Sequence, residues 1–343
     1  MSGPLPEGAQ RERRRQAFVR AAGWADAVVE PLTGDASFRR YWRLRRGGRS
    51  LILMDAPPGR ESAADFVAVA QLLRTAGLSA PAIHHAAADG FLLLEDFGDA
   101  TFTRLLNQGA DAHDLYALAV DALIVLRQRV QLSTLPTLRR LSAPVLLDQV
   151  ELLTQWYLPL AGGGVPHESA AAAWRAAWTE VLAGRPAEPE TLVLYDYHVD
   201  NLIRLTDRSA VAACGLLDFQ DAVKGPALFD LVSLLRDVRR DVPPDLAQAM
   251  QARYRAAFAP MGDGDFDHAA ALWALQRNCR ILGTFARLCV RDGKPGYLAF
   301  LPRVWRLVAE DAAHPALSPV REWLDRHVPP PARHITPPEA GRG

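Results

Sequence analysis

A change of pattern near Gly98 constrains the fold of this chain more than any other feature. Before it, the β-prone runs Phe38–Leu44 and Ser50–Met54 are joined by an Arg-Gly-Gly turn signal at 46–48, which predicts a hairpin. Apolar residues at helical spacing follow over Ala64–Ala76, and "FLLLEDFGD" has the pattern of a short buried strand. The order of hairpin, helix and strand predicts a small α+β lobe.

Beyond this point apolar residues recur three or four positions apart, which predicts a mostly helical region. The exception is Thr191–Phe219, where two β-prone pieces flank a turn. We therefore expect a small N-terminal lobe over residues 1–96, a helical lobe over 97–328, and a disordered tail over 329–343. The predicted helices are Asp114–Val130, Ala143–Tyr157, Ser169–Leu182, Leu228–Val238, Leu246–Phe258 and Ala269–Val290.

Composition removes several classes of function. Of the 343 residues 49% are hydrophobic, and the formal net charge is zero. A neutral chain lacks the electrostatic attraction that binds nucleic acid or an anionic membrane, so we expect neither partner. Three scattered cysteines without metal-ligand spacing indicate reduced thiols, and no apolar run reaches the ~20 residues of a membrane span. We expect a soluble, cytoplasmic monomer.

Polar residues gather on two loops that directly adjoin buried strands. The stretch "LYDYHVDNLIRL" presents Asp196 and Asn201, and "GLLDFQDA" presents Asp218. Three oxygen ligands of this kind suit Mg2+ on a nucleotide. Phosphoryl transfer to a hydroxyl needs one carboxylate to orient the nucleophile, while an amide and a second carboxylate hold the metal. We predict Asp196 as the catalytic residue, with Asn201 and Asp218 as metal ligands.

The order D-x4-N followed by D-F-x is the layout of the kinase catalytic and metal loops. The chain resembles the aminoglycoside phosphotransferase superfamily of kinase-like enzymes and, within it, the bacterial anomeric N-acetylmuramate/N-acetylglucosamine kinases. The narrower resemblance is carried by "LTGDASFRRYWRL", "LMDAPP", "DYHVDNL", "LDFQDAVKGPALFDLVSLLRD" and "RILGTFARLCVRDGKPGYL". It implies a two-lobed protein-kinase-like α+β fold, with an N-terminal nucleotide-binding lobe over residues 1–96 and a helical catalytic and substrate lobe over 97–328. The implied reaction is ATP- and Mg2+-dependent phosphorylation of the anomeric hydroxyl of these amino sugars in cell-wall recycling.

Two positions depart from the superfamily pattern. Leu194 stands where a histidine usually precedes the catalytic aspartate, so a backbone group or another side chain has to orient the loop, and His198 is one candidate. No lysine occurs before Lys224, and Met54 occupies the expected place of the phosphate-binding lysine. Some cation should replace that lysine.

The remaining candidate residues fall into two groups. Small residues of "LTGDASFRRY" would let backbone N–H groups approach phosphates, one of the two arginines would supply the missing cation, and the strand end at "LLLEDF" would meet adenine. The predicted nucleotide-binding residues are Gly34, Ser37, Arg39, Arg40, Glu95 and Phe97. The predicted acceptor-binding residues are His198, Gln220, Asp221, Arg277 and Arg280. Asp230, at a predicted helix start, is interpreted as structural.

Two other functions stay open. One is a kinase for another hydroxylated metabolite, such as an aminoglycoside, choline or homoserine. An aminoglycoside site should be acidic, whereas the candidate acceptor helix is rich in arginine. The other is a non-catalytic nucleotide-binding module, which the absent lysine and Leu194 favour. Retention of all three motif residues argues against it.

Overall fold

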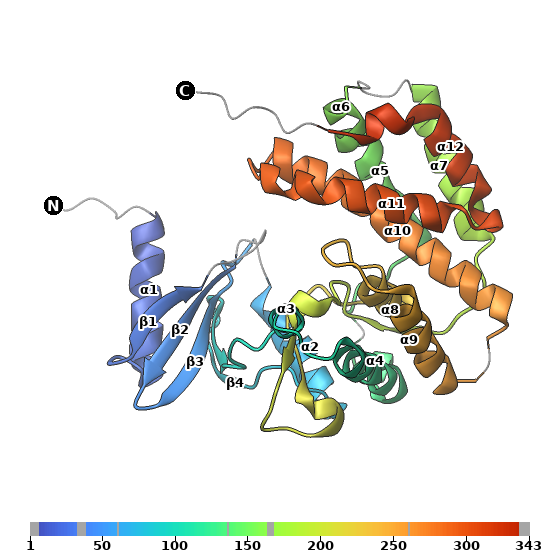
Figure 1. The fold of residues 1–343 in the computed structure, drawn as a ribbon. Helices are drawn as coiled ribbons and strands as arrows, with labels where there is room; N and C mark the ends of the chain where they lie inside the picture. The colour runs from blue at the N-terminus through green and yellow to red at the C-terminus, as the bar shows by residue number, and fades with distance from the viewer. Residues whose placement is uncertain are drawn as a thin grey trace. The chain divides into compact units, whose positions relative to one another are not determined.

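The structure is a computed structural model that describes residues 7–32, 39–59, 62–135, 137–162, 168–259 and 261–335. Two compact units divide the chain. The first comprises Met1–Val130 and Val199–Asp221, and the second comprises Gln131–His198 and Ala222–Gly343. The first holds the N-terminal sheet and the second holds the long C-terminal helices (Figure 1).

An antiparallel five-stranded sheet in the order β1-β2-β3-β5-β4 forms the centre of the first unit (Figure 1). Its strands are β1 (Val28–Leu32), β2 (Arg40–Arg46), β3 (Arg49–Asp55), β4 (Ile83–Ala86) and β5 (Phe91–Glu95). The predicted hairpin is β2–β3, and its turn residues Gly47 and Gly48 have φ values of 52° and 76°. Consecutive positive φ angles are the signature of a type I′ turn, which glycine adopts without strain.

Helix α1 (Glu7–Ala21) packs against the sheet (Figure 1). Val19 of the helix and the following Trp24 join Leu44, Leu53 and Phe91 of the strands in one hydrophobic cluster. A buried ion pair of 2.6 Å between Arg11 and Asp55 ties the helix to the end of β3. The N-terminal helix therefore forms part of the core of the sheet.

A second, two-stranded hairpin belongs to the same unit. It consists of β7 (Leu202–Arg204) and β8 (Cys214–Leu216), as the sequence predicts. A main-chain bond from Leu216 N to Ser79 O (2.8 Å) and one from Arg204 N to Ala100 O (2.9 Å) attach it to the chain on either side of β5. The other helices of the unit are α2 (Ala63–Thr75), α3 (Phe102–Asn107) and α4 (Ala112–Arg129).

The compact units therefore divide the chain differently from the expected lobes. Helices α3 and α4 and the hairpin at Val199–Asp221 group with the sheet, since their main-chain contacts are with its flanking segments. The lobe boundary between residues 96 and 97 stays a prediction.

Helix α10 (Asp263–Val290) is the centre of the second unit and packs against α5, α8 and α11 (Figure 1). Gly283 lies inside it because a Cβ atom there would stand 2.2 Å from the carbonyl carbon of Leu152. The helices are α5 (Ala143–Leu152), α6 (Leu158–Leu160), α7 (Glu168–Ala183), α8 (Phe229–Leu235), α9 (Pro244–Ala256), α11 (Leu301–Ala312) and α12 (Ser318–His327). A π-helical turn at Leu153–Tyr157 follows α5, and β6 (Glu190–Val193) pairs with β9 (Val223–Pro226).

The described residues include the start of the segment that we expect to be a disordered tail. Residues Pro330–Arg333 form a 3-10 turn, and the Tyr157 hydroxyl donates to the carbonyl of Ala332 at 2.9 Å. Within the described residues, no helix is both long and apolar enough to cross a bilayer.

Candidate active site

The β7–β8 hairpin brings Asn201 and Asp218 together. Leu202 pairs with Leu216, so Asn201 lies opposite Leu217, the residue before Asp218. A hydrogen bond of 2.9 Å from Leu217 N to Asn201 O continues the ladder by one step. The two predicted metal ligands therefore flank the open end of one hairpin in the first unit.

Asp218 adopts a backbone conformation that few non-glycine residues tolerate, with φ of 55°. Its Oδ1 accepts hydrogen bonds from Arg39 Nη2 (3.2 Å) and from Gln220 Nε2 (2.9 Å). The Gln220 amide also donates to Asp221 (3.1 Å), whose side chain is exposed. A cationic and a neutral donor therefore hold the carboxylate of Asp218, and strained positions of this kind concentrate at functional sites.

Arg39 and Arg40 have opposite environments. The Arg39 side chain is buried and reaches Asp218, whereas Arg40 is exposed at the start of β2. Met54 is fully buried in β3, as expected for the residue in place of the lysine. Of the two arginine candidates, Arg39 is therefore the one that lies beside a motif residue. The predicted nucleotide-binding residues Gly34 and Ser37 lie outside the described residues.

Side chains at the end of β5 hold the hairpin. Glu95 accepts from Arg208, which lies in the β7–β8 connection, and from the backbone N–H of Ala82 (3.0 Å). The Phe97 ring lies under the Arg208 guanidinium at 5.2 Å and against Gly215 of β8, where a Cβ atom would stand only 2.9 Å from the ring. The side chains predicted to lie near adenine thus support the strand pair that carries Asn201 and Asp218.

Arg43, which the sequence analysis did not single out, fixes the segment after β5. It binds Asp96 at 2.7 Å and Asp99 at 2.8 Å. The alternation of arginines in "RRYWRLRR" places Arg39, Tyr41 and Arg43 on one face of β2 and would have indicated it.

The Asp196 loop lies in the second unit, and Asp230 holds it. The Asp230 carboxylate, buried in the first turn of α8, accepts from Leu194 N (2.6 Å) and Tyr195 N (3.0 Å). Asp196 N donates to Leu194 O (3.0 Å) across Tyr195, whose φ is 79°, which is a classic γ-turn. Asp230 therefore shapes the turn before Asp196 and is a side chain of the kind that the sequence requires there, in place of the candidate His198.

Burial raises the pKa of Asp230 to about 7, and the two backbone N–H donors oppose this rise. We interpreted Asp230 as structural because it lies at a helix start. Its hydrogen-bond donors are instead Leu194 and Tyr195, the two residues that directly precede the candidate catalytic carboxylate. Proximity in the sequence gives no signal for this contact.

An aromatic stack supports the same turn. The Tyr195 ring stacks on Phe229 of α8 with 5.7 Å between centroids and 3° between planes. On Tyr195 lies the guanidinium of Arg280, 4.3 Å from the centroid. Arg280, a predicted acceptor ligand, is therefore committed to a cation–π contact with the residue beside Asp196.

His198 is buried and makes its contact with Arg239, whose Nη1 lies 3.2 Å from His198 Nε2. Because arginine can only donate, Nε2 accepts and the ring is neutral, with its proton on Nδ1. Burial lowers the pKa of His198, and the positive charges of Arg239 and Arg277 lower it further. His198 therefore stays uncharged and serves to position Arg239.

Arg277, the other arginine predicted to bind the acceptor, is 2% exposed in α10. Among the residues that the structure describes, neither its Nε nor its Nη1 has a hydrogen-bond partner. Burial and then the neighbouring Arg280 lower its pKa to about 10, while Asp237 and Asp196 act in the opposite sense. It remains a buried guanidinium in the electrostatic neighbourhood of Asp196.

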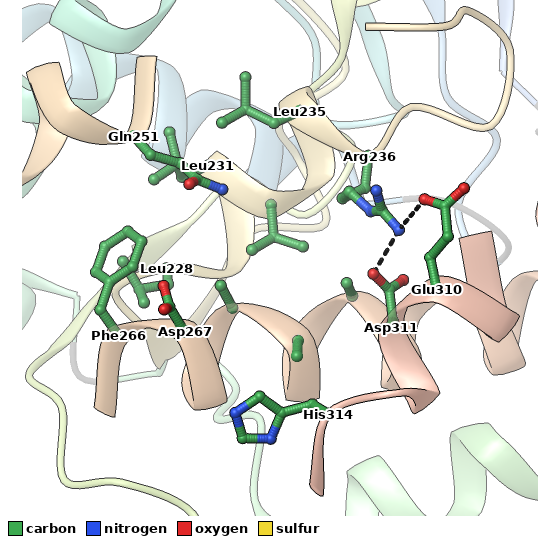
Figure 2. Close-up of a pocket in the computed structure, with 14 residues that line it drawn as sticks. Leu228, Leu231, Leu235, Arg236, Gln251, Phe266, Asp267, Glu310, Asp311 and His314 are labelled. Carbon is green, nitrogen blue, oxygen red and sulfur yellow. Dashed lines mark hydrogen bonds and ion pairs between the residues drawn. The ribbon is translucent and has the colours of Figure 1, made fainter. Parts of the chain in front are cut away.

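A pocket of about 350 Å3 opens elsewhere in the second unit, between α8, α9, α10 and α11 (Figure 2). Leucines of α8 face small alanines of α10 in it, and at one end Arg236 binds Glu310 (2.9 Å) and Asp311 (2.6 Å). None of the predicted site residues lines this pocket. The pocket is therefore not the candidate site that the motif residues define.

The candidate metal ligands Asn201 and Asp218 would supply an amide and a carboxylate oxygen. No cluster of three or more histidine, cysteine, aspartate or glutamate side chains occurs in the part of the chain that the structure describes. Two oxygen donors fit Mg2+, which completes its shell with water and phosphate and is rarely bound by a full protein cage. They would not suffice for a structural metal.

Comparison with known proteins gives one consistent result. The family model described as "Phosphotransferase enzyme family" matches residues 28–272. A protein from Caulobacter vibrioides named N-acetylmuramate/N-acetylglucosamine kinase is 36% identical, with 93% of this chain and 97% of that protein covered. A protein of the same name from Pseudomonas aeruginosa is also 36% identical, with 89% and 90% covered.

Solved structures share the fold at low sequence identity. A choline/ethanolamine kinase family protein from Mesorhizobium loti superimposes with a TM-score of 0.61 at 16% identity, covering 91% of this chain and 99% of its own. An aminoglycoside phosphotransferase from Streptomyces rimosus, in complex with ADP and streptomycin, gives 0.54 at 19% identity and covers 78% and 97%. These likenesses confirm the predicted two-lobed kinase-like α+β fold.

Proposed function

Because the chain belongs to the phosphotransferase enzyme family, we propose that it transfers the terminal phosphoryl group of ATP to the anomeric hydroxyl of N-acetylmuramate and N-acetylglucosamine. The observation that carries the proposal is the shared name of its relatives, which match almost the whole chain. A role in cell-wall recycling follows from these acceptors.

Asp196 is the residue that would orient the acceptor hydroxyl and take its proton. The γ-turn at Tyr195 and the two hydrogen bonds to Asp230 fix its backbone before substrate arrives. An anomeric hydroxyl is more acidic than an ordinary alcohol, so a carboxylate needs only to accept the proton late in the transfer. Catalysis is then mainly positioning and charge stabilisation.

Asn201 and Asp218 would hold Mg2+ on the nucleotide phosphates. When bound, the metal supplies positive charge that neutralises the transferring group. Arg39 stands beside Asp218 and provides the cation that Met54 cannot. Its guanidinium has a spread of N–H donors that suits phosphate oxygens, so it can replace the absent lysine.

The arginines near Asp196 favour a neutral or anionic acceptor. Arg239, Arg277 and Arg280 lie on the second unit with Asp196, and each carries a positive charge. A polycationic aminoglycoside or a choline would be repelled by such a surrounding. Gln220 and Asp221, in the first unit, remain proposed sugar contacts.

The test is ATP turnover with a panel of acceptors: N-acetylmuramate, N-acetylglucosamine, a 1-O-methyl glycoside of each, choline and kanamycin. We expect turnover with the two free sugars and none with the glycosides, which lack the anomeric hydroxyl. Phosphorus-31 NMR of the product should show the phosphate coupled to the anomeric proton. Turnover of choline or kanamycin alone would select the metabolite-kinase alternative, and no turnover at all would select the non-catalytic module.

A further inference from the structure

Arg277 presents buried hydrogen-bond donors without acceptors. Its side chain is 2% exposed, and within the described residues Nε and Nη1 have no hydrogen-bond partner. Leaving charged donors unsatisfied in a protein interior is costly, and buried arginines in folded proteins are normally paired. An acceptor from outside the protein would resolve this.

The neighbouring arginines are engaged differently. Arg280 lies flat on the Tyr195 ring at 4.3 Å, and Arg239 donates to His198 at 3.2 Å. Both contacts are with the loop that carries Asp196, and Arg277 feels the charges of Asp196 and Asp237 in the same cluster. The unsatisfied guanidinium therefore belongs to the acceptor side of the candidate site.

We propose that Arg277 binds the carboxylate of an acidic acceptor sugar and so sets the preference for N-acetylmuramate over N-acetylglucosamine. This inference rests on the proposed function. The two sugars differ by one lactyl ether, which carries the carboxylate. The two unsatisfied donors, Nε and Nη1, lie on different edges of the planar guanidinium, and either can form a charge-assisted hydrogen bond with a carboxylate oxygen.

The transferring phosphoryl group is the other oxyanion that could occupy the same donors. It is common to every acceptor, whereas the carboxylate is present on only one of the two sugars. Comparison of the two sugars therefore separates the sources.

The experiment measures kcat/KM for both sugars in the wild type, Arg277→Met and Arg287→Met. Methionine keeps the length and apolar stem of arginine and removes the charge. We expect Arg277→Met to lose about 10- to 100-fold with N-acetylmuramate, the effect of one charge-assisted pair, and less than about 3-fold with N-acetylglucosamine. Arg287 is the matched control, since it is an arginine of the same helix roughly 15 Å further along its axis.

Chemical removal of the charge from the sugar provides the second arm. The methyl ester of N-acetylmuramate keeps the lactyl ether and loses the negative charge. In the wild type the ester should lose about as much as Arg277→Met loses with the acid. In Arg277→Met, kcat/KM should be nearly equal for the acid and the ester. A purely structural arginine would instead leave the same difference between acid and ester as in the wild type.

Thermal unfolding guards against a folding defect. Replacing an unpaired buried charge by an apolar residue is often neutral or stabilising, so we expect an unchanged or higher Tm. If Arg277→Met does not fold, the ester arm on the wild type still decides, and an ester as good as the acid overturns the inference.

Two further outcomes overturn it. Equal losses with both sugars assign Arg277 to the phosphoryl group or to the loop, and no loss with either assigns it to packing. If the wild type phosphorylates neither sugar, the proposed function fails first and the inference falls with it. That result is visible before any variant is made.

Discussion

The β7–β8 hairpin end and the turn at Tyr195 present the two halves of one polar motif and are held by different means. Asn201 and Asp218 are fixed by local strand pairing, with Leu217 N bonded to Asn201 O. The loop before Asp196 is fixed by the buried carboxylate of Asp230, which is distant in the sequence. Strand pairing between neighbouring segments fixes Asn201 and Asp218, whereas a single buried side chain fixes the loop before Asp196.

Loss of the hairpin carboxylate should have the largest effect. Asp218→Ala removes a proposed metal ligand and the partner of Arg39, so we expect Mg2+-dependent ATP affinity and activity to fall below detection. Isothermal titration with and without Mg2+ measures it. Asp207→Ala, in the exposed turn at the other end of the hairpin, is the control and should bind normally. Surviving Mg2+-dependent affinity would remove Asp218 from the metal site.

Asp196→Asn should produce the converse pattern. We expect kcat to fall by roughly 10²- to 10⁴-fold, because the acceptor loses its orienting base, with Mg2+-dependent ATP binding nearly intact. Steady-state kinetics and nucleotide titration together check this. If ATP affinity instead fell as far as in Asp218→Ala, Asp196 would be assigned to the metal site, and the two halves of the motif would have the same role.

Asp230→Asn tests the support of the turn. An amide keeps one acceptor oxygen but turns its NH2 toward the second backbone N–H, so one hydrogen bond is lost and the other is no longer charge-assisted. We expect kcat to fall about 10- to 100-fold with unchanged ATP affinity. Asp245→Asn, an exposed acid in the first turn of α9, is the matched control for a simple helix-start role. Similar small effects at both would reduce Asp230 to a helix-start residue.

Arg39→Ala should weaken ATP binding or slow transfer about 10-fold, and Arg40→Ala should change neither. The reason is geometric, since Arg39 is buried beside Asp218 and Arg40 is exposed. Kinetics at varied ATP concentration distinguish the two. Equal effects would show that the cation replacing the lysine lies elsewhere.

The smallest effect is on stability. The pKa of Asp230 rises from 3.8 to about 7 on folding, so the native state binds more protons than the unfolded state between these values. Its contribution is thus fully present below about pH 4 and is lost as pH rises through about 7. The free energy of unfolding of Asp230→Asn, measured by urea titration from pH 5 to 8, should fall less steeply with pH than that of the wild type. Parallel profiles would contradict the raised pKa.

The same contrast explains what the sequence could reveal. The hairpin β2–β3 and the adjacency of Asn201 and Asp218 follow from turn signals and from residues that flank paired strands, both local patterns. Edge strands β1 and β4 escaped prediction because "VVEPL" and "IHHA" lack strict alternation. Helices α11 and α12 were also not assigned.

The roles of individual side chains depended on contacts across long sequence separations. Alternation indicated that one of Arg39 and Arg40 faces inward but not which, because the buried face depends on tertiary packing. The contact of Asp230 with Leu194 and Tyr195 leaves no periodic trace at all. Arg277 and Arg280 look alike in the sequence, yet Arg280 contacts the Tyr195 ring, whereas Arg277 is almost fully buried.

Tyr195 combines an unfavourable backbone with a useful ring. Its φ of 79° would suit glycine far better, so Tyr195→Gly should relieve local strain. The same change would delete the platform between Arg280 and Phe229. Selection for thermal stability and selection for turnover would therefore choose different residues at this one position, which makes it a site of trade-off between the two properties.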